Sequence, residues 1–217
     1  SWETGSAADG AAGDDVLDFS RSRQDERGLH KRGIDLDLGA GAVDTWYPAG
    51  EAPAEGKSYE VSHIEHARGT AHADRFRGVG GEMNMFVGGA GDDEFWLEDS
   101  DDFPLEFAGE GLDIVYASVS YALPVAVERL QLLEAPEAIQ ALGNDESNEL
   151  IGNAQGNYVE GLEGNDTLKG GAGQDTLSYA HLDRPVQVSL YQKFATAQNK
   201  RDVVDEFEIV LGSAYDD

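Results

Sequence analysis

Residues 161–178 contain two aspartates in a spacing that suits calcium. Asp166 and Asp175 each lie five residues after a glycine, in stretches that read GLEGNDTLK and GGAGQDTLS. Glycine permits backbone conformations that other residues avoid, so a tight turn of this kind can gather several carbonyl groups beside one carboxylate. Ca²⁺ takes about 6–8 oxygen ligands from carboxylates and backbone carbonyls. The spacing therefore indicates that each turn supplies part of a calcium site.

The same pattern recurs along the chain as a repeat of nine residues. Four consecutive repeats fill residues 143–178, and others occupy 10–18 and 69–96, where the middle repeat has one extra residue. The eighth place of every complete repeat is apolar, and its occupants are Leu17, Phe76, Phe86, Phe95, Leu150, Val159, Leu168 and Leu177. The sixth place is always Asp or Asn, and its occupants are Asp15, Asp74, Asn84, Asp93, Asn148, Asn157, Asp166 and Asp175. A fixed short period of this kind is typical of a solenoid.

Each repeat predicts a glycine-rich turn followed by a strand of about three residues. Side chains alternate along a strand, so the eighth-place residue points inward and its neighbours point outward. Two repeats would form one coil, and repeats n and n+2 would stack about 4.8 Å apart. Unit 152–160 then lies on 170–178 and unit 143–151 on 161–169, which places Asp166 and Asp175 on opposite edges. We therefore predict an all-β fold, a parallel β-roll or β-solenoid with calcium-binding glycine-rich turns and inserted loops.

The last two repeats fit the pattern G-G-x-G-x-D-x-U-x, in which U is a large apolar residue. On these residues the chain resembles the RTX, or hemolysin-type, calcium-binding repeats of secreted toxins, proteases, adhesins and epimerases. The resemblance implies that Ca²⁺ lies between stacked turns. Asn148 and Asn157 are weaker candidates, because a neutral amide attracts Ca²⁺ less than a carboxylate does. The candidate ligands are the turn glycines and the polar residues at or beside the sixth place: Gly10, Asp15, Asp74, Gly88, Gly89, Gly91, Asp92, Asp93, Gly143, Asp145, Asn148, Gly152, Asn157, Gly161, Gly164, Asn165, Asp166, Gly170, Gly171, Gly173 and Asp175.

The segments between the arrays show a similarity of their own. Residues 10–20 align with 170–180, 34–38 with 186–190, and 61–74 with 204–217. One unit thus recurs: calcium repeat, strand, variable loop, strand, calcium repeat. We expect the strands to extend the solenoid as larger coils, with loops 20–33, 39–58, 97–112 and 191–203 bulging outward. The predicted divisions are the first repeat with its insertion (1–68), array one (69–96), a linking β segment (97–142), array two (143–178) and a second strand-loop-strand segment (179–217).

Composition limits the possible partners. The net charge of the 217-residue chain is −28, which opposes binding to nucleic acid because that requires basic patches. The same charge predicts a chain that repels itself until divalent cations neutralise it. Cysteine is absent, and no apolar run has the length of a membrane span. The resemblance implies secretion by a one-step, type I exporter, and since both ends fall close to a repeat we expect the chain to be part of a longer protein.

Other chemistry is less well supported by the sequence. The acidic run 92–102 includes Glu98, Asp99, Asp101 and Asp102, and we interpret these four as a solvated charge cluster rather than an extra calcium loop. The histidines His63, His66 and His72 resemble part of a metalloprotease zinc site, but the HExxH half is missing. No serine elbow, phosphate-binding loop or cysteine nucleophile is present.

The sequence therefore predicts a non-enzymatic, calcium-binding structural module of a large secreted protein. Such a module would fold when it meets calcium outside the cell. Two alternatives remain open. The chain could be an adhesin or polysaccharide-binding module that contacts a host surface or glycan through loop aromatics such as Trp46, Tyr47 and Trp96. It could instead be the accessory part of a secreted protease or epimerase.

Overall fold

Short strands joined by glycine-rich turns build nearly all of the structure. The computed structural model describes residues 8–9, 16–19, 33–46, 58–137 and 139–217. The chain divides into two compact units, 1–113 and 114–217, and the boundary lies within the predicted linking segment. All regular elements among the described residues are β-strands, as predicted. None of the described segments forms an apolar helix of the length needed to cross a bilayer.

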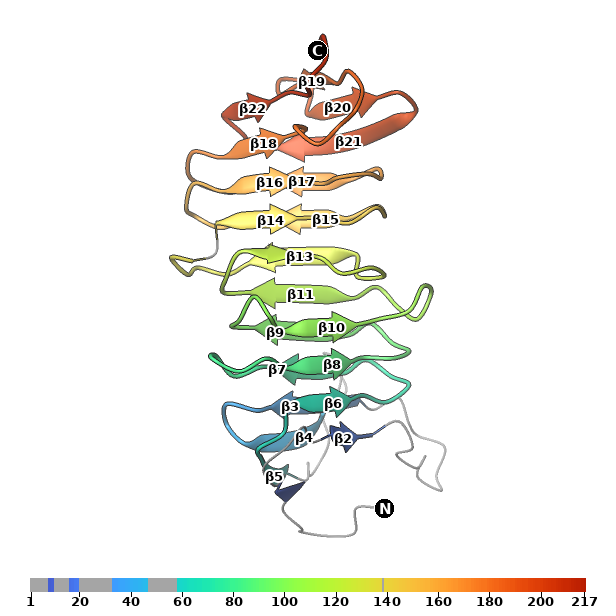
Figure 1. Ribbon diagram of the computed structural model, residues 1–217, viewed down its shortest axis with the longest axis vertical. Coiled ribbons are helices and arrows are strands. Elements are labelled where there is room, and N and C mark those ends of the chain that lie inside the picture. The colour runs from blue at the N-terminus through green and yellow to red at the C-terminus, as the bar shows by residue number, and fades with distance from the viewer. Residues whose placement is uncertain (1–7, 10–15, 20–32, 47–57, 138) are drawn as a thin grey trace. The chain divides into compact units, whose positions relative to one another are not determined.

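The first unit has mostly parallel strands on two faces, which Figure 1 shows as stacked rungs in blue to green. One face has the order β1-β5-β4-β3-β7-β9 and the other β2-β6-β8-β10. The bounds are β1 Ala8–Asp9, β2 Val16–Asp18, β3 Gly33–Asp37, β4 Ala42–Trp46, β5 Ser58–Ser62, β6 His66–Arg68, β7 Arg75–Arg77, β8 Met85–Val87, β9 Glu94–Leu97 and β10 Phe103–Leu105.

The second unit follows the same plan. One face has the order β11-β13-β15-β17-β21-β20-β19 and the other β12-β14-β16-β18-β22. The bounds are β11 Ile114–Ala117, β12 Tyr121–Ala122, β13 Arg129–Leu132, β14 Gln140–Leu142, β15 Glu149–Ile151, β16 Tyr158–Glu160, β17 Thr167–Lys169, β18 Thr176–Ser178, β19 Gln187–Ser189, β20 Phe194–Ala197, β21 Lys200–Asp205 and β22 Ile209–Leu211.

The predicted stacking of every second repeat is confirmed. In array two Leu150 pairs with Leu168, and Val159 pairs with Leu177, in parallel ladders. In array one β7 pairs with β9, so that Phe76 lies beside Phe95. Consecutive repeats therefore contribute to opposite faces.

The eighth-place side chains form the core, as their period predicts. Each of them is buried, from Leu17 in the first unit to Leu177 in the second. In array one the phenylalanines stack: the rings of Phe76 and Phe95 are 5.4 Å apart with an interplanar angle of 7°, and Phe86 approaches Phe76 from the facing sheet at 5.2 Å. The flanking residues are half-exposed in strands such as Arg75–Arg77, whereas the ninth-place Glu160 and Ser178 are buried.

Two of the predicted outward loops contain strands instead. Strand β4 lies in segment 39–58 and β20 in 191–203, and both are antiparallel to their neighbours. Each forms the middle of a three-stranded meander, β5-β4-β3 and β21-β20-β19. The two meanders occupy equivalent positions, which agrees with the internal sequence similarity. The expectation of an outward loop was wrong for β4 and β20, because ladder hydrogen bonds to the neighbouring strands satisfy their backbone groups, while residues 47–57 lie outside the described residues.

The predicted loop 97–112 also requires correction. Strand β10 lies within it and continues the solenoid, with Pro104 paired to Phe86 of β8. Pro104 is buried like an eighth-place residue, and Asp102, two positions earlier, is 1% exposed. The segment is therefore a degenerate repeat that lacks the opening glycine, and Asp102 belongs to the interior rather than to a solvated charge cluster.

Candidate metal centres at the turns

The sixth-place residues of successive coils are joined by a hydrogen-bond ladder. In array two the backbone N–H of Asn148 donates to Asp166 Oδ1 at 2.9 Å, and that of Asn157 donates to Asp175 Oδ1 at 2.7 Å. The ladder continues when Asp166 N–H donates to Asp202 Oδ1 at 2.9 Å. These three acids therefore each fix the turn of the coil before them.

Array one has the same arrangement. Asp74 Oδ1 accepts from Ile34 N–H at 2.6 Å, and Asp93 Oδ1 accepts from Asp74 N–H at 2.6 Å. Asp113 Oδ1 in turn accepts from Asp93 N–H at 2.8 Å. Carboxylates of successive coils are thereby stacked in the interior. Each of them has lost the water that would normally solvate its charge.

The ladder uses only one oxygen of Asp93, Asp166 and Asp175, whereas both oxygens of Asp74 are bonded because its Oδ2 accepts from Thr70 N–H at 2.6 Å. The Oδ2 atoms of Asp93, Asp166 and Asp175 are enclosed and have no hydrogen-bond partner among the described residues. An unsatisfied polar atom in a buried position destabilises a fold by about 1–3 kcal/mol, and more when it is charged. A bound cation would therefore supply the partner that these oxygens lack. Carboxylate and carbonyl oxygens at flexible turns form the donor set that Ca²⁺ prefers.

Burial raises the pKa of these acids in the metal-free fold. Desolvation raises the pKa of Asp93 to about 9, and repulsion from Asp74, Glu106 and Asp113 adds to the effect. Desolvation raises the pKa of Asp166 to about 7, with a further contribution from Asp202. At neutral pH the turns must therefore hold either protons or a compensating cation.

The turn glycines are required by close backbone approach. Gly164, at the fourth place, has φ +129°, a conformation that side chains rarely adopt, and a Cβ there would collide with the carbonyl oxygen of Glu146 in the coil below. At the first place, a Cβ on Gly161 would collide with Asp166 Oδ2. The same holds for the equivalent glycines, which at the first place are Gly88, Gly143, Gly152 and Gly170, at the second Gly89 and Gly171, and at the fourth Gly91 and Gly173.

The two asparagine repeats of array two satisfy their turns in another way. Asn148 Nδ2 donates to Asn144 Oδ1 at 3.0 Å, while Asn144 N–H donates to Asn148 Oδ1 at 2.8 Å. The second pair repeats this, with Asn157 Nδ2 donating to Asn153 Oδ1 at 3.1 Å and Asn153 N–H donating to Asn157 Oδ1 at 2.7 Å. In these turns the asparagine Oδ1 lies beside the first-place glycine, where the aspartate turns have their unpartnered Oδ2, and it accepts from the N–H of the second-place asparagine.

Three other predicted ligands lie toward solvent. The side chains of Asp92, Asp145 and Asn165 are exposed. Asp92 Oδ1 accepts from Leu112 N–H at 3.0 Å, and Asn165 Oδ1 accepts from Arg201 N–H at 2.9 Å, so both hold neighbouring backbone. Gly10 and Asp15 lie outside the described residues.

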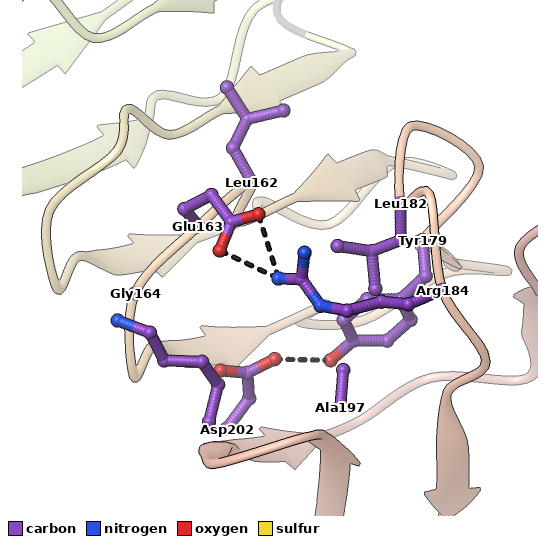
Figure 2. Close-up of a pocket in the computed structure, with 9 residues that line it drawn as sticks. Leu162, Glu163, Gly164, Tyr179, Leu182, Arg184, Ala197 and Asp202 are labelled. Carbon is purple, nitrogen blue, oxygen red and sulfur yellow. Dashed lines mark hydrogen bonds and ion pairs between the residues drawn. The ribbon is translucent and has the colours of Figure 1, made fainter.

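Sequence reasoning missed several buried acids of the ladder. Asp202 is one of them, and it closes the turn that contains Asp166. Figure 2 shows the small pocket beside it, where the hydroxyl of Tyr179 points at Asp202 and Arg184 reaches across to Glu163. Tyr179 Oη–H donates to Asp202 Oδ2 at 2.7 Å, so both oxygens of Asp202 have partners. Two further buried acids were missed, Glu106 and Asp113. The exposed Glu208 was missed as well, and its Oε2 accepts from Asp175 N–H at 2.8 Å.

Among the described residues, one cluster of three acidic side chains has ligand atoms close enough together to hold a metal ion, and the cluster contains no histidine. Its members are Asp93, Glu106 and Asp113. The histidines at 63, 66 and 72 do not come together as a set of ligands in the described part of the chain, and zinc therefore finds no support there.

A comparison with known families agrees with this geometry. A family model of the RTX calcium-binding nonapeptide repeat matches residues 79–103 and 142–177, in four copies. The chain carries RTX calcium-binding repeats. The matched RTX segments include Asp93, Asp166 and Asp175, whose second oxygens are enclosed and unpartnered. The chain is thus a calcium-binding module with a β-roll fold. No curated protein matches it at a significant level.

Proposed function

We propose that this RTX module folds when it binds calcium. The observation that carries the proposal is the set of enclosed, unpartnered oxygens on Asp93, Asp166 and Asp175. Each lies in a stacked turn where no compensating donor reaches it. A cation that binds only the folded state stabilises that state by RT ln(1 + [L]/Kd), or about 2.7 kcal/mol at a hundredfold excess over Kd.

The charge of the chain acts in the same direction. With a net charge of −28, the unfolded chain is expanded by self-repulsion, and folding brings the acids still closer together. On the outer strand faces arginine side chains form ion pairs with glutamates, as between Arg75 and Glu94 at 2.8 Å and between Arg129 and Glu149 at 2.8 Å. Calcium at the turns would offset the negative charge of the acids that have no basic partner.

RTX repeats are typical of secreted proteins. We further propose that the module serves as a structural part of a larger exported toxin, adhesin or exoenzyme, without catalysis of its own. A chain that remains unfolded at low internal calcium can pass through a type I exporter and then fold in the higher calcium concentration outside. The aspartate turns support this order of events because they make the folded state depend on the cation.

A titration followed by far-ultraviolet circular dichroism tests the proposal. Calcium added to chelator-treated protein should produce the β signal in a cooperative step. Magnesium at equal ionic strength is the control, because it screens charge equally but needs near-octahedral coordination and retains its water. A full β signal in excess chelator, or equal folding with magnesium, would contradict calcium-coupled folding.

A further inference from the structure

A carboxylate that the nonapeptide pattern does not include follows array one, directly after β10. Glu106 lies eighteen residues after Gly88, at the position where the next stacked repeat would open with glycine. The match to the RTX repeat ends at residue 103, so the pattern assigns nothing to Glu106 or Asp113. Both are nevertheless buried, at 5% and 1% exposure.

Glu106 is held firmly against the first turn of repeat 88–96. Its Oε1 accepts from Gly88 N–H at 3.0 Å, and its Oε2 accepts from Gly89 N–H at 3.3 Å. A Cβ on Gly88 would collide with both Glu106 Oε1 and Asp93 Oδ2, so these two oxygens face the same point of the backbone. Ligand oxygens of Asp93, Glu106 and Asp113 all lie within 4.8 Å of one another.

An independent observation points to a missing ligand at this place. Asp93 is fully buried, and its Oδ2 has no hydrogen-bond partner among the described residues. Its Oδ1 is already occupied by the N–H of Asp74. The oxygens of Glu106 each accept one backbone bond, and a carboxylate oxygen has a second lone pair that can bind a metal ion.

We propose that Glu106 is a cation ligand that joins Asp93 and Asp113 in a three-carboxylate site closing array one. The inference rests on the proposed calcium-coupled function and extends it to residues outside the repeat. All three ligands offer oxygen atoms, and they come from stacked turns. Such a set suits Ca²⁺, whose coordination is flexible and whose distance to ligand oxygens is about 2.3–2.6 Å. A glutamate in place of the opening glycine thus provides a side-chain ligand where an ordinary repeat has none.

The test counts bound calcium in the wild type and in two variants. Glu106→Gln removes one charge from the site, and Glu98→Gln is the matched control because it removes one charge from an exposed position in the same coil. Calorimetry or equilibrium dialysis at calcium concentrations that saturate the wild type should give one fewer ion for Glu106→Gln and an unchanged number for Glu98→Gln. A full count in Glu106→Gln would overturn the site while leaving calcium-coupled folding intact. Absence of calcium from the wild type would overturn the proposed function, and the site with it.

Crystals of the calcium-loaded wild type provide a measurement that does not depend on how the variant folds. Anomalous diffraction should show a calcium peak within about 2.3–2.6 Å of a Glu106 oxygen. Peaks at the Asp166 and Asp175 turns without one beside Glu106 would show that this cluster is neutralised by protons instead, and would overturn the inference.

Discussion

Replacing Asp166 by asparagine should have opposite effects with and without calcium. Asp166 Oδ1 accepts from Asn148 N–H, and its enclosed Oδ2 has no partner. Asp166→Asn keeps an oxygen for the Asn148 bond and replaces the charged oxygen by an N–H₂ group. Unlike Asn148, which bonds Asn144, residue 166 has Leu162 at the second place of its repeat, and leucine offers no side-chain acceptor.

The size of each effect follows from the environment of Asp166. Burial raises its pKa from 3.8 to about 7. Since one pKa unit corresponds to about 1.4 kcal/mol, its ionisation at pH 8 costs the calcium-free fold on the order of 4 kcal/mol. The unsatisfied amide in the variant costs about 1–3 kcal/mol, so the calcium-free variant should be more stable than the wild type. With calcium at a hundredfold excess over Kd, loss of one site costs the variant about 2.7 kcal/mol.

Urea unfolding at pH 8, followed by circular dichroism, measures both effects. In calcium the midpoint of Asp166→Asn should fall. In chelator, where a stabilising osmolyte is used to populate the folded state, the variant should need less osmolyte than the wild type. Glu137→Gln, which removes an exposed charge in the same unit, is the control. A variant that is equally destabilised under both conditions would refute the reasoning, because Asp166 would then have only a structural role.

Three further expectations concern pH, the turn and the core. In chelator the folded fraction should fall as pH rises from 5 to 9. In the folded state the pKa values of Asp93 and Glu106 are about 9 and 8, so these acids hold protons that the unfolded chain has already released. A β signal in circular dichroism that grows over the same pH range would contradict this. Gly164→Ala should cost at least about 1–3 kcal/mol in urea unfolding through backbone strain, whereas Glu146→Ala, also at a fourth place, should cost under about 0.5 kcal/mol. Leu168→Ala, at a fully buried position, should cost about 2–5 kcal/mol, and an unchanged urea midpoint would argue against the predicted core.

The sequence predicts the solenoid and its register because the signal is local and repeated. An eighth-place apolar residue such as Leu168 can be buried in only one way once strands of about three residues alternate in and out. The stacking of Leu150 on Leu168 then follows from two repeats per coil, and the structure confirms it.

The acids outside the repeats could not be recognised through glycine spacing. Asp113 and Asp202 have no opening glycine at the usual distance, yet each stands two residues before a buried apolar side chain, Val115 and Val204. An acid two positions before an apolar core residue is therefore the pattern by which the sequence could have indicated these two acids. It is weak in a chain with 43 acids, since many acids meet such a condition by chance.

The meander strands and the asparagine turns depend on contacts between distant residues. Strand β20 is defined by antiparallel pairing with β19 and β21, which residue spacing alone does not indicate. The amide pairs formed by Asn144 with Asn148 and by Asn153 with Asn157 depend on the exact orientation of their turns. The neutral amides alone mark Asn148 and Asn157 as weaker candidates, but the sequence could not show that their turns satisfy themselves.

Small-angle X-ray scattering with and without calcium tests the central claim most directly. If the enclosed aspartate oxygens make folding depend on calcium, the chelator-treated chain should approach the radius of gyration of an unfolded chain of 217 residues, roughly 50 Å. Added calcium should reduce that radius sharply over the same concentrations at which calcium binds. A radius that is small in chelator and does not change with calcium would contradict the account.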